Sequence, residues 1–181
     1  MAKSSGSINQ PCLMMSDGGS MSENITKEQA LVLVDQARRH QMHGEFADAI
    51  ILYKRSVELF PTAEAWTYLG WTYSMMGRFG EAIAACHQAI TTDPTFGNPY
   101  NDIGAYLIEL EQWEEAIPWL MKATKAPRYE VPQFPHLNLG RVYEHLGQFR
   151  TALRYYDQAL AIDPMYRMAW IAKYQLLGRL N

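Results

Sequence analysis

Several features that usually point to a function class are scarce in this sequence. Its 181 residues include only two cysteines, and its net charge is −3 with a pI near 5.9. Two distant cysteines do not make a disulfide framework, and an acidic chain lacks the basic surface that nucleic acids attract. No apolar run approaches the length of a membrane span. We therefore expect free thiols at Cys12 and Cys86, a cytoplasmic location, no nucleic-acid partner and no membrane insertion.

Residues 1–24 are rich in Ser, Gly and Asn, and a lone Lys3 is their only basic residue. A stretch of this composition buries too little apolar surface to fold, and it lacks the apolar core of a secretory signal. We expect a flexible segment, followed by a folded domain over residues 25–181. Met21 is a second possible start, and the residues do not decide between it and Met1. Thr26-x-x-Gln29 has the form of a capping box that would begin the first helix.

Motifs for catalysis and for cofactor binding are also missing. The sequence has no phosphate-binding glycine loop, no dinucleotide fingerprint and no Gly-x-Ser-x-Gly elbow. His40 and His43 are spaced to share one helix face, but no nearby Cys, Asp or Glu completes a recognised zinc pattern. We interpret His40 as a packing residue. The sequence therefore predicts no enzymatic activity, no cofactor and no metal site.

What the sequence does have is an internal repeat with a period near 34 residues. Three columns of small residues keep one register, at steps of 33, 34 and 36 residues. The columns are Ala37, Gly70, Gly104 and Gly140; Ala49, Ala82, Ala116 and Ala152; and Ser56, Ala89, Ala123 and Ala159. Because the columns are independent and share the same steps, they indicate four copies of one structural unit.

The unit has the pattern of two short antiparallel helices. In the second copy Trp66, Leu69, Gly70 and Tyr73 fall at i, i+3, i+4 and i+7, which places them on one face of a helix. Gly77 suits the turn that follows, and Pro94 ends the second helix of the same copy. Small residues at facing positions would let the two helices approach closely. One such hairpin cannot bury both of its apolar faces, so we expect neighbouring hairpins to stack.

The motif Trp66-x-x-Leu69-Gly70-x-x-Tyr73, followed by Ala82, Ala89 and Pro94, resembles the tetratricopeptide repeat. The resemblance implies an all-α, right-handed superhelical array of about four helix-turn-helix repeats. They would span about residues 30–62, 63–96, 97–132 and 133–166, with a C-terminal capping helix over 165–179. The first repeat fits least well, since His40 takes the place of a tyrosine. Pro127, Pro132 and Pro135 mark a longer loop between the third and fourth repeats.

The resemblance also implies a function. In this family the inner faces of the leading helices form a concave groove that binds peptide segments of partner proteins. Mapping the groove positions onto this sequence predicts a partner-binding surface formed by Arg38, Tyr68, Trp71, Asn98, Asn101, Asp102, Ala105, Asn138 and Arg141. Trp71 and Arg141 flank the small Ala105 and would give one pocket an aromatic wall and a cationic wall. The lysine by which chaperone-binding members hold a C-terminal carboxylate is absent from its position.

We thus predict a non-enzymatic adaptor or scaffold that binds an extended segment of a partner protein in the groove. The alternative is a structural protein that forms homo-oligomers through its terminal helices. A third hypothesis is a module that recruits a separate enzyme subunit. The residues do not identify the partner, the pathway or the oligomeric state.

Overall fold

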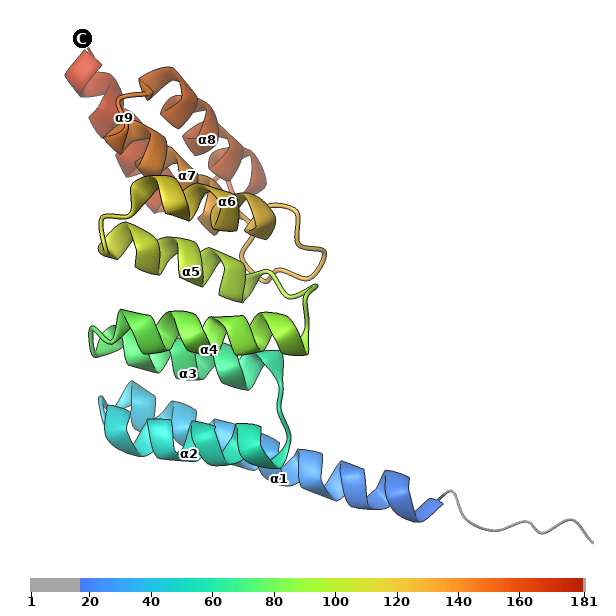
Figure 1. Ribbon diagram of the computed structural model, residues 1–181. Helices are drawn as coiled ribbons and strands as arrows, with labels where there is room; N and C mark the ends of the chain where they lie inside the picture. Colours follow the sequence, from blue (N-terminus) through green and yellow to red (C-terminus); the bar gives the residue numbers. More distant parts are fainter. Residues whose placement is uncertain (1–16, 181) are drawn as a thin grey trace, which may run out of the picture.

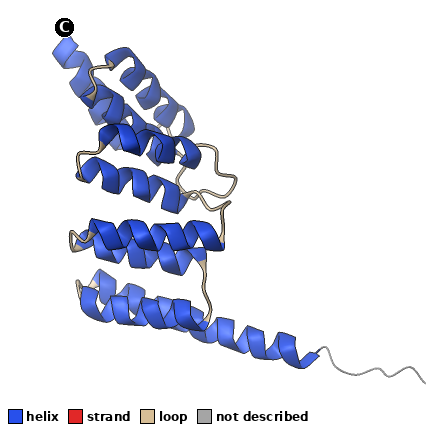
Figure 2. Cartoon of the chain, in the orientation of Figure 1, coloured by secondary structure: helices blue, strands red, loops and turns tan. Residues whose placement is uncertain are grey.

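The computed structural model describes residues 17–180, which form a single row of stacked helices (Figures 1 and 2). Within this range there are nine α-helices, and the only β-type pairing is an isolated bridge between Phe96 and Arg128. The helices are α1 (Asp17–Met42), α2 (Phe46–Leu59), α3 (Ala63–Met75), α4 (Phe79–Thr92), α5 (Asn98–Glu109), α6 (Trp113–Ala123), α7 (Gln133–His145), α8 (Phe149–Ile162) and α9 (Arg167–Leu180). The predicted all-α array of four hairpins and a terminal helix is confirmed.

The helices pair in sequence order, and the pairs stack in the same order. Each hairpin is a leading helix packed on the trailing helix that follows it, as in α3 with α4. Leading helices also contact one another along the array, from α1 through α3, α5 and α7 to α9. The backbones of the trailing helices stay farther apart, and these helices meet through side chains, as where the ring centres of His87 in α4 and Trp119 in α6 lie 5.2 Å apart. The leading helices therefore form a continuous inner layer, and this layer carries the residues predicted to line a groove.

The small-residue columns are the places where paired helices approach most closely. Ala37, Ala49, Ala82, Ala116 and Ala152 have no exposed surface. A Cβ atom added to Gly140 would lie 2.2 Å from Cε1 of Tyr156, and one added to Gly104 would lie 2.5 Å from Cδ2 of Leu120. These glycines are needed for space, because their side-chain positions are already filled by the partner helix.

The turns inside the hairpins require a left-handed backbone. Gly44, Gly77 and Gly147 have φ angles of 78°, 71° and 72° at equivalent positions, and Glu111 has a φ of 59° in the third hairpin. Glycine adopts this conformation without steric cost, whereas glutamate does not. The third hairpin therefore makes the same turn as the others despite a less suitable residue.

Helix α1 begins earlier than the sequence suggested. It starts at Asp17, so residues 17–24 of the segment expected to be flexible are helical, while residues 1–16 lie outside the described range. The predicted capping box is wrong, because Thr26 lies within the helix and its Oγ1 donates to the carbonyl of Ser22. The N-terminal part of α1 makes few packing contacts. Met21 and Ile25 are exposed, and Ala30 is the first buried residue of α1 that the structure describes. Because this part of the helix buries no apolar face, its sequence has no apolar periodicity from which a helix could be predicted.

Helix α9 covers the end of the array. Its residues Ala169 and Leu176 are buried in one cluster with Leu137 of α7 and with Ala152 and Tyr156 of α8. The indole Nε1 of Trp170 donates to the carbonyl of Pro164 over 2.9 Å. None of the described helices combines the length and the apolar character needed to cross a bilayer.

The close packing at Gly140 gives a direct test of the hairpin geometry. We expect Gly140→Ala to lower the free energy of unfolding by about 1–3 kcal/mol, because the new methyl group collides with the ring of Tyr156. Gly80→Ala is the matched control, since Gly80 lies in α4 with open space around its Cβ position. There we expect equal or greater stability, by up to about 1 kcal/mol. Urea unfolding followed by circular dichroism measures both, and equal midpoints for Gly140→Ala and wild type would contradict the packing.

Candidate functional site

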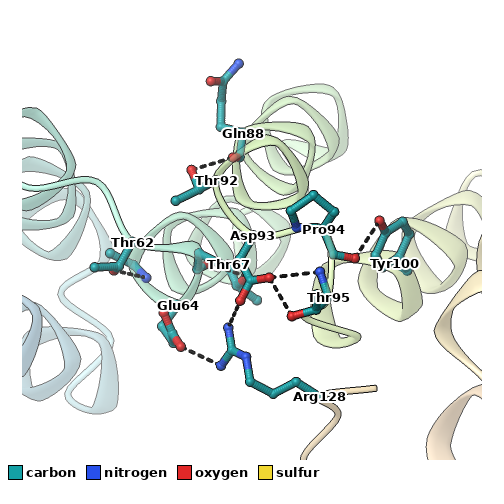
Figure 3. Close-up of polar contacts among 12 residues, drawn as sticks. Thr62, Glu64, Thr67, Gln88, Thr92, Asp93, Pro94, Thr95, Tyr100 and Arg128 are labelled. Atoms are coloured by element: carbon teal, nitrogen blue, oxygen red, sulfur yellow. Dashed lines mark hydrogen bonds and ion pairs between the residues drawn. The ribbon is translucent and has the colours of Figure 1, made fainter. Parts of the chain in front are cut away.

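The loop over residues 124–132 folds back against the second hairpin (Figure 3). Its Arg128 donates through Nη1 to Glu64 Oε1 of α3 over 2.7 Å and through Nη2 to Asp93 Oδ2 over 2.6 Å. The guanidinium group also lies over the ring of Phe96, 4.1 Å from its centre. One side chain thus ties the loop to α3 and to the turn after α4.

Two backbone hydrogen bonds hold the same loop at Arg128. The amide of Gly97 donates to the carbonyl of Arg128 over 2.7 Å, and the amide of Arg128 donates to the carbonyl of Thr95 over 3.2 Å. A Cβ atom at Gly97 would lie 2.7 Å from Cγ of Tyr129 and 2.9 Å from Cβ of Ala126. The loop can therefore dock only because residue 97 is glycine.

Asp93 is held as an anion at this junction. Its Oδ1 accepts bonds from the amide and the hydroxyl of Thr95, at 2.8 and 2.6 Å, and its Oδ2 accepts from Arg128 (Figure 3). These bonds, first those from Thr95 and then that from Arg128, lower the pKa of Asp93 to about 2. The anchor of the loop stays charged at any pH near neutrality.

The docked loop completes a cavity of about 310 Å³ on the inner layer. We call it the central cavity. Three helices and the loop supply its lining, which consists of Thr67, Tyr68 and Trp71 from α3, Asn98, Asn101 and Asp102 from α5, Tyr129, Glu130 and Val131 from the loop, and Phe134 from α7. Five of the residues predicted from the sequence to line the groove meet here: Tyr68, Trp71, Asn98, Asn101 and Asp102.

A chain of hydrogen bonds links α7 to α5 beside this cavity. Arg141 Nη1 donates to Asn138 Oδ1 over 3.5 Å, Asn138 Nδ2 donates to Asn101 Oδ1 over 3.0 Å, and Asn101 Nδ2 donates to Asp102 Oδ1 over 3.4 Å. Asn101 and Asn138 are both buried. The sequence placed both residues in the partner-binding surface, but in the structure their amides bond to each other.

Asp102 has the most strongly shifted pKa among the acids of the site. Its side chain lines the central cavity, and burial raises its pKa to about 7, although the bond from Asn101 opposes the shift. No lysine or arginine of the described residues lies within ion-pair distance of it. Two further polar atoms, Asn98 Oδ1 and the hydroxyl of Tyr129, are buried and have no hydrogen-bond partner among those residues. Both residues line the cavity, but these two atoms are themselves enclosed by protein atoms and are not exposed to it.

The other predicted groove residues lie on either side. Arg38 lines a neighbouring cavity of about 350 Å³ together with Gln41, Met42 and Met75, and this cavity shares Tyr68 and Trp71 with the central one. Arg38 also lies over the ring of Tyr68, 5.3 Å from its centre. Trp71 is about half exposed, at 51%. Its ring thus stands between two adjacent hollows of the inner layer.

Trp71 and Arg141 do not share the single pocket expected around Ala105. Arg141 lines a third cavity, of about 790 Å³, between α7 and α9, with Glu144, His145 and Met168. Ala105 lines neither this cavity nor those beside Trp71. Asn101 and Asn138 lie between Arg141 and the central cavity, and Arg141 reaches that cavity only through their hydrogen bonds. The aromatic wall expected at Trp71 and the cationic wall expected at Arg141 therefore belong to different cavities.

The central cavity also includes the loop residues Tyr129, Glu130 and Val131, which were not predicted from the sequence. The available signal was the 36-residue step between the third and fourth copies, which revealed an insertion but not where it packs.

The two histidines of α1 point to different partners. His40 Nδ1 lies 2.5 Å from Glu45 Oε2, whereas His43 Nδ1 bonds to the carbonyl of Arg39 over 2.7 Å. His40, Glu45 and Asp48 place possible ligand atoms within 4.8 Å of one another, but both acids are exposed. The absence of a metal site stays a prediction.

Comparisons with known proteins agree with the architecture. The sequence profile of the tetratricopeptide repeat matches residues 63–96 and 135–166. The TPR repeat-containing thioredoxin TTL4 of Arabidopsis thaliana is 26% identical over 125 residues, which are 65% of this chain and 18% of that protein. This chain thus spans less than a fifth of the length of the curated relatives it matches.

Two solved structures share the fold. PilF of Pseudomonas aeruginosa has a TM-score of 0.78 at 18% identity, over 87% of this chain and 70% of that one. YrrB, described as a TPR protein with an unusual peptide-binding site, has a TM-score of 0.63 at 21% identity, over 90% of this chain and 84% of that one. At these identities the likeness concerns the fold alone.

The raised pKa of Asp102 makes stability depend on pH. Between about pH 4, the usual pKa of an aspartate in an unfolded chain, and pH 7, the folded state keeps a proton that the unfolded state has lost. Stability therefore falls as the pH rises through this window. We expect Asp102→Asn to exceed wild type by about 1 kcal/mol or more at pH 8, with the difference shrinking toward pH 4.

Urea unfolding at several pH values measures this difference. Gly80→Ala is a non-titrating control, and its effect should be the same at every pH. A stability difference between Asp102→Asn and wild type that stays constant from pH 4 to 8 would contradict the raised pKa.

Proposed function

This chain belongs to the tetratricopeptide repeat family, and on that basis we propose that it binds an extended segment of a partner protein along its inner layer. Repeats of this family act as protein-interaction scaffolds. The single observation that carries the proposal is the pair of adjacent cavities on the leading helices, with the half-exposed Trp71 between them. An extended segment could place successive side chains in the two cavities while its backbone crosses the indole ring.

The residue types around these cavities suit a binding surface. Tryptophan, tyrosine and arginine dominate the residues whose loss most weakens protein complexes. Arg38, Tyr68 and Trp71 lie together at the N-terminal cavity of the pair. The description of YrrB as a protein with a peptide-binding site supports the same use of this fold.

We propose no catalytic role. The thiol of Cys86 is fully buried, and burial raises its pKa well above the usual value, so it is a poor nucleophile. The carboxylates of Asp102 and Glu130, which line the central cavity, are suited to holding a ligand. The proposed activity is therefore binding of a partner without a chemical reaction. The proposed location is the cytoplasm, where thiols stay reduced.

The alternative of self-assembly has one observation in its favour. Helix α9 exposes Met168, Ile171, Tyr174 and Leu180 at the end of the array. A second copy that covered this face would bury apolar surface and extend the row of helices.

The groove proposal is tested by substitutions on the inner layer. Affinity capture from a lysate followed by mass spectrometry would supply the partner, and calorimetry with the purified partner would measure binding. We expect Trp71→Ala and Arg38→Ala each to weaken binding by about 1 kcal/mol or more, which is typical of an interface anchor. Both side chains are exposed, so the fold should survive.

The matched control is Arg55→Ala, because Arg55 is exposed on the trailing helix α2. It should bind the partner as wild type does. Tight binding by folded Trp71→Ala and Arg38→Ala would place the recognition surface elsewhere and would overturn the proposal.

The self-assembly alternative is tested by light scattering after size exclusion over a range of concentrations. Assembly through α9 predicts a mass that grows with concentration and returns to the monomer value in Met168→Lys with Tyr174→Lys. A constant monomer mass of 20.7 kDa in the wild type would exclude it.

A further inference from the structure

We propose that the central cavity binds the side chain of an arginine in the partner segment. The inference rests on the proposed binding along the inner layer, and it names the chemistry of the residue that is bound. It is carried by the carboxylate acceptors, the charge and the aromatic walls of this cavity.

The acceptors are the first support. Asn98 Nδ2 donates to Glu130 Oε2 over 3.3 Å, while Asn98 Oδ1 is buried without a partner among the described residues. The hydroxyl of Tyr129 is also buried without a hydrogen-bond partner among the described residues. Both atoms are enclosed by protein, so the acceptors that the cavity itself offers a ligand are the carboxylates of Asp102 and Glu130. A guanidinium group carries five N–H donors in a rigid fork and has no acceptor.

The charge of the lining is the second support. Asp102 and Glu130 are its two charged side chains, and it includes no lysine or arginine. Arg141 is linked to Asp102 only through Asn138 and Asn101, so it gives the carboxylate no direct ion pair. A cation that enters the cavity would supply the missing partner. An anionic side chain would meet two carboxylates and is disfavoured.

The walls are the third support. Trp71 presents half of its surface, and Tyr68 and Phe134 line the same cavity. The ring of Phe134 is held by stacking on Tyr166, with 5.5 Å between ring centres and 16° between planes. Planar guanidinium groups stack on aromatic faces, and this arrangement is more favourable where water is excluded. Arg38 already lies over the ring of Tyr68 in the neighbouring cavity, so the protein itself uses this contact.

Asp102 makes the proposed binding depend on pH. The groups that face it are Cys86 from α4, Tyr106 on its own helix, Tyr129 from the loop and Asn101, with Glu130 in the same lining. Burial raises the pKa of Asp102 to about 7. The carboxylate is therefore ionised above neutrality and protonated below it. Arginine should bind more weakly at pH 6 than at pH 8, by roughly fivefold.

The test uses the full chain labelled with ¹⁵N and titrated at pH 8 with N-acetyl-arginine amide. The neutral isostere N-acetyl-citrulline amide and N-acetyl-lysine amide are run beside it. We expect saturable shifts of the Trp71 indole and the Asn98 side-chain amide with the arginine probe, and at least tenfold weaker binding of the citrulline probe. Asp102→Asn should weaken arginine binding by about tenfold or more. Glu109→Gln, an exposed carboxylate at the end of the same helix, should leave it unchanged.

Several results would overturn the inference. They are equal binding of the arginine and citrulline probes, tighter binding of lysine than of arginine, unchanged binding in folded Asp102→Asn, or no saturable shift at about 20 mM arginine probe. The two proposals can also fail separately. If Trp71→Ala abolishes partner binding but Asp102→Asn does not, the arginine inference fails and the groove stands. If the arginine probe binds but no inner-layer variant affects the partner, the groove proposal fails.

Discussion

The close approach of the two helices in each hairpin is the constraint on which the rest of the structure depends. At Gly104 a side chain would collide with Leu120, and at Gly70 a Cβ atom would lie only 3.0 Å from the carbonyl oxygen of Ala82. The space left by these small residues fixes how each leading helix sits on its trailing helix. Because all four hairpins share this spacing, the leading helices meet one another and form the inner layer. The cavities that we connect with binding lie on this layer, and their position follows from the spacing.

The insertion between the third and fourth hairpins turns an open surface into a walled cavity. Arg128 bonds to Glu64 and Asp93 at once, and so it holds the loop against an earlier repeat (Figure 3). Gly97 leaves room for Tyr129 beside the start of α5. The central cavity is therefore a property of this particular chain, since the repeat by itself supplies the helices but not the loop wall.

The polar residues of the inner layer divide into two kinds. Asn101 and Asn138 bond to each other, are buried, and tie α5 to α7. Asp102, Asn98 Oδ1 and the hydroxyl of Tyr129 retain capacity that the described residues do not use. The first kind stabilises the array, whereas the second kind destabilises it unless a ligand pairs with it. Of the second kind, the Asp102 carboxylate lines the central cavity, and it favours a donor-rich cation as the bound group.

The sequence by itself determined the helices, their pairing and the direction that each leading helix faces. Those features follow from local periodicity: the column of Gly70 marks the buried face, and Trp71, one residue later, must point away from it. Only the tertiary structure decided where the loop packs, because Arg128 and Glu64 are 64 residues apart and no local pattern joins them. The same holds for the separation of Trp71 from Arg141 and for the raised pKa of Asp102. Periodicity records which face of a helix is buried, whereas ion pairs and desolvation depend on which distant segments come to lie around a side chain.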